Sequence, residues 1–149
     1  KTNFCLGVAG YPEKHFEAPN METELKFTKH KVELGGEYLV TQMFFDNKAY
    51  FSYVENCRAR GITVPIIPGL KPITTKKQLS ILPRIFAINI PQDLVSAVEA
   101  AKDDKAAKQV GIEWCAAQSK ELMDAGVPVL HYYSMGKSDA VKQIASGLF

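Results

Sequence analysis

Four apolar runs of strand length alternate with helical patterns along this chain, and this alternation limits its possible folds more than any other feature. The runs cover residues 4–9, 38–45, 64–69 and 127–133. Strands alternating with helices are typical of a parallel sheet whose strands are joined by crossover helices. The runs are continuously apolar instead of alternating with polar residues, which predicts strands covered on both faces.

The segments between the runs carry helix start and stop signals. Gly35 and Gly36 fit a helix C-terminus, Asp46 or Asn47 fits an N-cap, and Pro91 fits a first helical position. The predicted helices cover residues 21–34, about 47–60, 75–82 with Thr74 or Thr75 as cap, a segment opened by Pro91, 104–124, and a last stretch from Ser138 or Asp139 to about Leu148.

Two architectures fit four strand–helix units: an open doubly wound sheet and part of a (β/α)8 TIM barrel. A dinucleotide-binding doubly wound sheet carries a GxGxxG turn, and the sequence contains none. A complete barrel needs about 250 residues, so four units in 149 residues predict half of one. We therefore expect an α/β fold in which residues 1–149 form the C-terminal half, the last four βα units, of a single TIM-barrel domain. The abrupt entry into a strand after Asn3 also indicates that the N-terminal half is absent from this chain.

Composition excludes several classes of function. The net charge is +2, without a basic block, so nucleic-acid binding is not expected. No apolar stretch approaches the roughly 20 residues of a membrane helix, and no signal peptide is visible. Cys5, Cys57 and Cys115 lie far apart, without a metal-ligand spacing, which predicts reduced thiols in a cytoplasmic protein and no metal site.

The active site of a TIM barrel lies at the carboxyl ends of its strands. Gln42, in the segment TQMFFDN, stands at such an end, and Lys71 and Thr74 follow the next run. A glutamine amide offers both a donor and an acceptor, which suits the edge of a heterocycle. A glutamine bonded only to neighbouring backbone explains the same pattern equally well. From the pattern alone, His15 and Lys31 fit exposed surface positions better than a site, and Lys137 is as consistent with solvent exposure as with a site.

Several segments closely resemble the methylenetetrahydrofolate reductase family. They are AGYPEKHFEAPN (9–20), VTQMFFDNKAYFSYVENCRARGI (40–62), VPIIPGLKPI (64–73) and HYYSMGKSDAV (131–141). They occur in the family's order and span nearly the whole chain. The resemblance implies the second half of that family's flavin-binding barrel.

The resemblance also implies an activity. NADH or NADPH reduces bound FAD, and the reduced flavin then passes hydride to 5,10-methylenetetrahydrofolate, giving 5-methyltetrahydrofolate for methionine synthesis. The sequence does not distinguish NADH from NADPH.

Individual residues of this sequence match family positions that contact the cofactor or the substrate. Those that match FAD contacts are Tyr11, His15, Ala18, Glu24 and Lys31. Those that match substrate contacts are Gln42, which meets folate or nicotinamide at the flavin face, Gln78, and Lys137, which stands where the family can have arginine. Lysine keeps that charge but loses the bidentate fork of arginine.

Other positions depart from the family pattern. Phe27 and His30 replace a polar FAD contact and an arginine, which leaves the details of nucleotide binding open, and Leu82 replaces a residue that can be aromatic. The family's general acid, a glutamate on the first strand, belongs to the absent half, so no catalytic residue is expected in this chain. We therefore expect an enzyme whose fragment alone is inactive.

Two further expectations concern assembly and an alternative function. A half-barrel has two open sheet edges, which favours a fragment of a larger chain or a homo-oligomer that covers them. The alternative function is a non-catalytic ligand-binding or interaction module derived from the reductase half-barrel.

Overall fold

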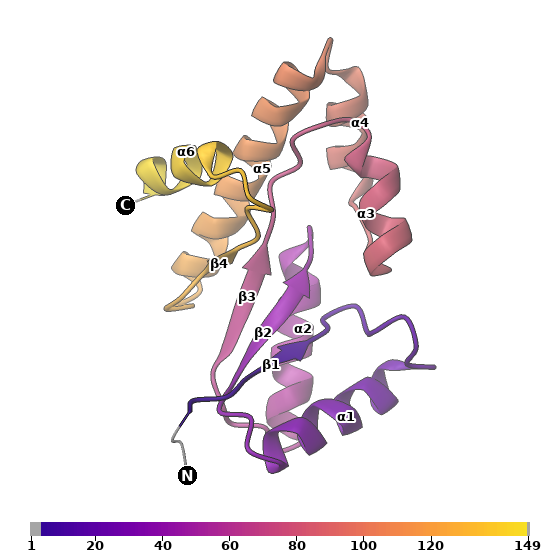
Figure 1. Ribbon diagram of the computed structural model, residues 1–149, viewed down its shortest axis with the longest axis vertical. Coiled ribbons are helices and arrows are strands. Elements are labelled where there is room, and N and C mark those ends of the chain that lie inside the picture. Colours follow the sequence, from indigo (N-terminus) through magenta and orange to yellow (C-terminus); the bar gives the residue numbers. More distant parts are fainter. Residues whose placement is uncertain (1–3, 149) are drawn as a thin grey trace.

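The computed structural model describes residues 4–148, which form a four-stranded parallel sheet with helices around it (Figure 1). The strands follow one another in the order β1-β2-β3-β4, and each is parallel to its neighbour. Their bounds are β1 Gly7–Gly10, β2 Tyr38–Met43, β3 Ile66–Leu70 and β4 His131–Tyr132. The parallel α/β fold predicted from the sequence is thus confirmed. Closure of this sheet into an eight-stranded barrel stays a prediction.

The outer strands are shorter than the apolar runs that predicted them. β1 begins at Gly7 instead of residue 4, and it pairs only with β2. β4 contains two residues, because Val127 still bonds to the end of the preceding helix through Leu122 O, at 3.0 Å, and Pro128 has no N–H to donate.

Helices occupy the segments between the strands and after the last one. Their bounds are α1 Met21–Glu33, α2 Asn47–Ala59, α3 Gln78–Phe86, α4 Gln92–Ala100, α5 Asp104–Asp124 and α6 Asp139–Leu148. The predicted cap Asp46 accepts a hydrogen bond from Lys48 N at 2.9 Å. No described helix is both long enough and apolar enough to cross a bilayer.

The prediction that Thr74 or Thr75 caps α3 is wrong. The N-cap position is Lys77, which makes no capping bond through its side chain. The Gln78 side chain folds back instead, and its Oε1 accepts a hydrogen bond from Thr74 N at 2.7 Å. The Thr74 N–H is thus bonded to a side chain ahead of the helix. Helix α3 begins at Gln78, later than the start near residue 75 that the two threonines predicted.

Most of the core lies between the sheet and helices α1, α2, α5 and α6. Leu39, Ile66 and Leu70 of the strands pack there against residues such as Tyr53 and Leu122 of the helices. This cluster explains why the strand sequences are apolar.

A second cluster covers the carboxyl ends of the strands. Met43 and Phe45 pack there against Leu82 of α3 and Leu94 of α4. Trp114 of α5 belongs to the edge of this cluster, and its indole N–H donates to Phe45 O at 3.0 Å. Helices α3 and α4 therefore sit above the strand ends, where a site is expected.

The two faces of the sheet differ in burial. Along β2, Leu39, Thr41 and Met43 are buried, whereas Val40 and Gln42 are only half-buried. Along β2 the expectation that the strands are covered on both faces is therefore met on one face only, whereas in β3 the consecutive residues Pro68, Gly69 and Leu70 are all buried. Gln42 belongs to the half-buried face, the face that a closed barrel encloses.

Candidate functional site

Two of the cavities near the carboxyl ends of the strands are lined by predicted site residues. The first, here called the α1 cavity, has a volume of about 500 Å³ and lies between α1 and the loop after β1. Its lining contains Tyr11, His15, Glu17, Ala18, Glu24, Phe27, His30 and Lys31. The structure thus brings together every residue that the resemblance assigned to FAD. Their binding of FAD stays a prediction.

Lys31 reaches from α1 toward the end of β1. Its Nζ donates to Ala9 O at 2.7 Å and lies 5.3 Å from the centre of the Tyr11 ring, within range of a cation–π interaction. Burial lowers the pKa of the Lys31 ammonium, and the nearby Glu24 partly offsets that effect. Burial also raises the pKa of Tyr11, with a smaller contribution from Glu24. Both groups are therefore held in a partly dehydrated setting.

Glu24 fixes the loop to the helix. Its side chain is buried, with 2% of the residue exposed. One oxygen accepts from His15 N at 3.1 Å, and the other accepts from the Thr28 hydroxyl at 3.2 Å. Both carboxylate oxygens therefore have protein partners, and the visible effect of Glu24 is to position the backbone of His15. The His15 ring in turn packs edge-on against Tyr11, with ring centres 4.8 Å apart.

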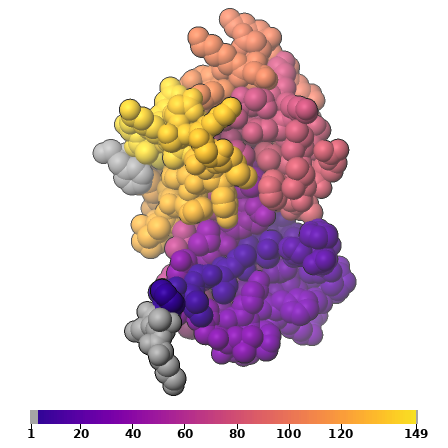
Figure 2. Space-filling view, in the orientation of Figure 1, coloured from indigo at the N-terminus to yellow at the C-terminus, as the bar shows by residue number. Residues whose placement is uncertain are grey.

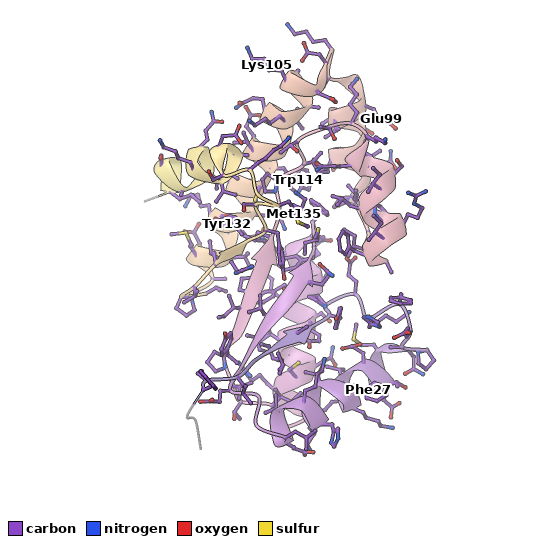
Figure 3. The ribbon with its side chains drawn as sticks, in the orientation of Figure 1. Phe27, Glu99, Lys105, Trp114, Tyr132 and Met135 are labelled. Carbon is purple, nitrogen blue, oxygen red and sulfur yellow. The ribbon has the colours of Figure 1, made fainter. Side chains whose placement is uncertain are left out.

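The second cavity, here called the β3/β4 cavity, has a volume of about 380 Å³. It lies between the segment after β3 and the segment that leads from β4 into α6, which face each other in Figure 2 as pink and yellow. Its polar lining comprises Lys71, Thr74, Thr75, Gln78, Lys108, Tyr133, Ser134, Lys137 and Asp139. Two predicted substrate residues, Gln78 and Lys137, are thus brought together here. Figure 3 separates the two cavities: Phe27 lies on α1, and Met135 lies beyond β4.

The two predicted substrate residues in this cavity are held differently. The Gln78 carbonyl oxygen is occupied by Thr74, whose N–H and hydroxyl lie at 2.7 and 3.3 Å, while its amide nitrogen makes no hydrogen bond to any residue of the described range. Lys137 is exposed and ends a tight turn in which its N–H donates to Ser134 O at 3.0 Å. Met135 and Gly136 inside this turn both have positive φ, 49° and 78°. The turn fixes the Lys137 backbone, and the side chain stays free to move.

Gln42 lines neither of these cavities. Its Oε1 accepts from Met43 N at 3.0 Å, so half of the amide is bonded to neighbouring backbone. The register of β2 against β3 is irregular between Val40 and Met43, and Thr41 bridges the gap by accepting from Gly69 N at 2.9 Å. The contact of Gln42 with a substrate stays a prediction, and the amide nitrogen is the part of the side chain still available for it.

Lys71 was given no function by the resemblance, although it follows a strand end. The structure buries it, with 5% of the residue exposed, on the wall of the β3/β4 cavity. Burial lowers the pKa of its ammonium, and the Cys115 thiol opposes that shift weakly. Its position directly after the third run is the sequence feature that marks Lys71 as a candidate site residue. Its burial was not predictable in this way, because it depends on α5 and α6.

Proteins of one family resemble this chain in sequence. The family model described as methylenetetrahydrofolate reductase matches residues 1–148. A Caenorhabditis elegans protein named probable methylenetetrahydrofolate reductase (NADPH) is 34% identical over 97% of this chain and 22% of its own length. For methylenetetrahydrofolate reductase 2 of Saccharomyces cerevisiae the identity is 37%, over 98% of this chain and 25% of that protein. A Pectobacterium carotovorum 5,10-methylenetetrahydrofolate reductase is 31% identical over 92% of this chain and 46% of its own length.

A solved structure shares the fold. It is an uncharacterized protein from Clostridium thermocellum, described as binding two copies of 5-methyl-5,6,7,8-tetrahydrofolic acid. It matches with a TM-score of 0.67 and 23% identity, over 95% of this chain and 51% of that chain. At this identity the likeness concerns the fold alone.

The fold, a parallel sheet with helices around it, defines an α/β protein with cavities at its strand ends. More narrowly, the chain belongs to the methylenetetrahydrofolate reductase family. It spans less than half the length of the curated relatives named above, between 22% and 46%.

Proposed function

We propose that this chain is the C-terminal half of the catalytic barrel of a protein that reduces 5,10-methylenetetrahydrofolate to 5-methyltetrahydrofolate, using FAD and NADH or NADPH. One observation carries the proposal: the residues implied for FAD are drawn from a loop and a helix, yet they line one cavity. Family membership supports the reaction class.

The chemistry of the α1 cavity suits a dinucleotide. Lys31 has N–H groups left beside the one that it donates to Ala9, and His30 lies on the same helix, so both can face phosphate oxygens. Phe27 is 58% exposed on the wall of the cavity and offers an aromatic surface for stacking by an adenine ring. When bound, FAD supplies the hydride chemistry that no side chain can perform.

The residues at the other strand ends then handle the substrate. The amide nitrogens of Gln42 and Gln78 are available as donors to a pterin or nicotinamide edge, since in both residues the carbonyl oxygen is engaged by the chain. Lys137 adds a positive charge at the rim. General acid chemistry belongs to the half of the barrel that this chain does not contain, so the fragment alone is expected to be inactive.

The test uses the full-length protein and begins with its absorbance spectrum, in which a bound flavin is visible directly. Fluorimetric titration should then show weaker FAD affinity in both variants: Lys31→Ala loses a charge-assisted contact, which costs about tenfold, and His15→Ala loses the ring that packs against Tyr11. Lys29→Ala is the matched control, because Lys29 lies on the same helix, outside the cavity lining. Unchanged FAD affinity in both variants would mean that His15 and Lys31 do not contribute to FAD binding.

Gln42→Glu separates the substrate residues from the cofactor residues. It keeps the size of the side chain and removes the N–H donors. FAD content should stay normal, because Gln42 is assigned to substrate binding and not to cofactor binding. Stopped-flow measurement should show flavin reduction and flavin oxidation both slowed, by roughly threefold to a hundredfold. Wild-type rates in both half-reactions would leave Gln42 as a structural strand-end residue. A full-length protein without flavin or reductase activity would support the binding-module alternative instead.

A further inference from the structure

Lys71 is a lysine with a buried stem, and its ammonium is accessible from the β3/β4 cavity and has no protein partner in the described part of the chain. It is 5% exposed, and its Nζ forms neither a hydrogen bond nor a salt bridge with any residue from 4 to 148. A lysine that packs its stem and leaves its ammonium unpaired at a cavity wall presents a charge-assisted donor to whatever enters that cavity. The lining of the β3/β4 cavity includes Lys71, so the open space next to this side chain is a ligand-sized volume and not packed protein.

The remaining charges around this cavity leave it positive. Lys108 and Asp139 form an ion pair with each other, so they largely cancel. Lys137 is the other cation of the lining, and it forms no salt bridge within residues 4–148. Two uncompensated lysines therefore face one volume of about 380 Å³ from opposite walls, one following β3 and one preceding α6.

Neutral donors complete the surroundings of Lys71. The Ser134 and Thr75 hydroxyls and the Gln78 amide nitrogen belong to the same lining. Hydroxyl and amide donors beside a lysine are the groups that bind carboxylate and phosphate oxygens. The first turn of α6 also lines the cavity, and its dipole adds to the positive potential.

We infer that Lys71 is an anion-binding residue, which holds a carboxylate or phosphate group of a substrate in the β3/β4 cavity. The inference rests on the proposed function for the identity of that substrate. Two substrates bring such groups: the glutamate tail of a folate, with its carboxylates, and the pyrophosphate of a nicotinamide dinucleotide. Lys71 would thereby add to substrate affinity without touching the reacting atoms. The lowered pKa caused by burial is consistent with a cation that lacks its counter-charge until the ligand enters.

The experiment measures binding to the full-length protein by calorimetry, with variants Lys71→Met and Lys71→Arg. Methionine matches the length of lysine without its charge, and arginine restores the charge. Lys77→Met is the control, because Lys77 is exposed, lies six residues along the same segment and is outside the lining. Four probes are used: 5-methyltetrahydrofolate, the corresponding tetrahydropteroate without glutamate, NADH, and inorganic pyrophosphate.

Loss of a charge-assisted contact should weaken binding by about tenfold to a hundredfold in Lys71→Met. If the anion is the folate tail, the loss appears with 5-methyltetrahydrofolate and is absent with the tetrahydropteroate. If it is a dinucleotide phosphate, the loss appears with NADH. Lys71→Arg should recover part of the affinity, and Lys77→Met should bind like wild type.

Wild-type affinity of folded Lys71→Met for every probe would overturn the inference. So would a wild-type protein that binds none of them. A protein that binds pyrophosphate through Lys71, but neither flavin nor folate, would instead retain the anion site and refute the proposed function.

Discussion

The α1 cavity and the β3/β4 cavity are built from similar residue types but differ in how their charges are partnered. In the first, Lys31 bonds to Ala9 O, and Glu24 has both oxygens occupied. In the second, Lys71 is buried without any partner among the described residues. The first cavity is therefore organised before a ligand arrives, as suits a cofactor that stays bound. The second contains a positive charge without a counter-charge, as suits substrates that enter and leave.

The largest expected effect concerns the support of the β3/β4 cavity. A Cβ added at Gly111 of α5 would lie 1.9 Å from Ile73 O, a backbone atom that cannot move without its segment. Gly111→Ala should therefore destabilise the protein by about 3 kcal/mol or more, at the upper end for overpacked sites. Chemical denaturation measures this loss.

Gly147→Ala is the matched control for Gly111→Ala. It lies in α6, and no atom of residues 4–148 is within 4 Å of the added Cβ, so alanine should stabilise the helix by up to about 1 kcal/mol. Equal effects of the two substitutions would mean that α5 does not need its close approach to the segment after β3.

A smaller effect is expected at the α1 cavity. Glu24→Ala removes the bonds that its carboxylate accepts from His15 N and from the Thr28 hydroxyl, and it leaves the half-buried His15 N–H unpaired, while Thr28 keeps its bond to the Tyr53 hydroxyl. The expected cost is about 2 kcal/mol in unfolding free energy, together with weaker FAD binding. Pyrophosphate binding at Lys71 should persist, and calorimetry checks both ligands.

Glu22→Ala is the comparison for Glu24→Ala on the same helix. Glu22 is exposed and, among the described residues, forms a salt bridge with Lys26 at 2.9 Å, so its loss should leave stability close to that of the wild type. If Glu24→Ala behaved like Glu22→Ala, the contrast between an organised cavity and an open one would fail.

The smallest expected effect has the opposite sign. Burial lowers the pKa of folded Lys71 below its unfolded value, so at any pH below the folded pKa the charged lysine destabilises the native state. Lys71→Met should therefore stabilise the ligand-free protein slightly near neutral pH. The gain should shrink as pH rises through the folded pKa toward about 10.4, where the unfolded lysine also loses its proton. Thermal melts at several pH values test this, and a destabilised Lys71→Met would show that Lys71 has a partner after all.

The order of the elements was predictable from sequence because it depends on local patterns. The long helix 104–124 and the β2 strand followed from apolar spacing and from end signals such as Gly126. The edges of the sheet were not predictable, since the length of β1 and β4 depends on which backbone groups find partners across space.

The site shows the same division. The resemblance identified the residues of the α1 cavity, and their proximity follows from a short loop and one helix. Lys71 is buried by elements some 40 to 70 residues away, so no local pattern distinguishes it from an exposed lysine. The hydrogen bonds that Glu24 accepts from His15 and Thr28 could not be predicted either. Sequence spacing predicts which residues share a helix face, but not which residues lie next to that face.

The hydrogen bond from Trp114 to Phe45 O gives the protein an internal optical reporter. Trp114 is the only indole of this chain, and it is tied to the segment that begins at Gln42 and ends at the cap of α2. Its emission will respond to changes in the hydration of that strand end. Ligand entry beside β2 can thus be followed in real time by fluorescence, without a label.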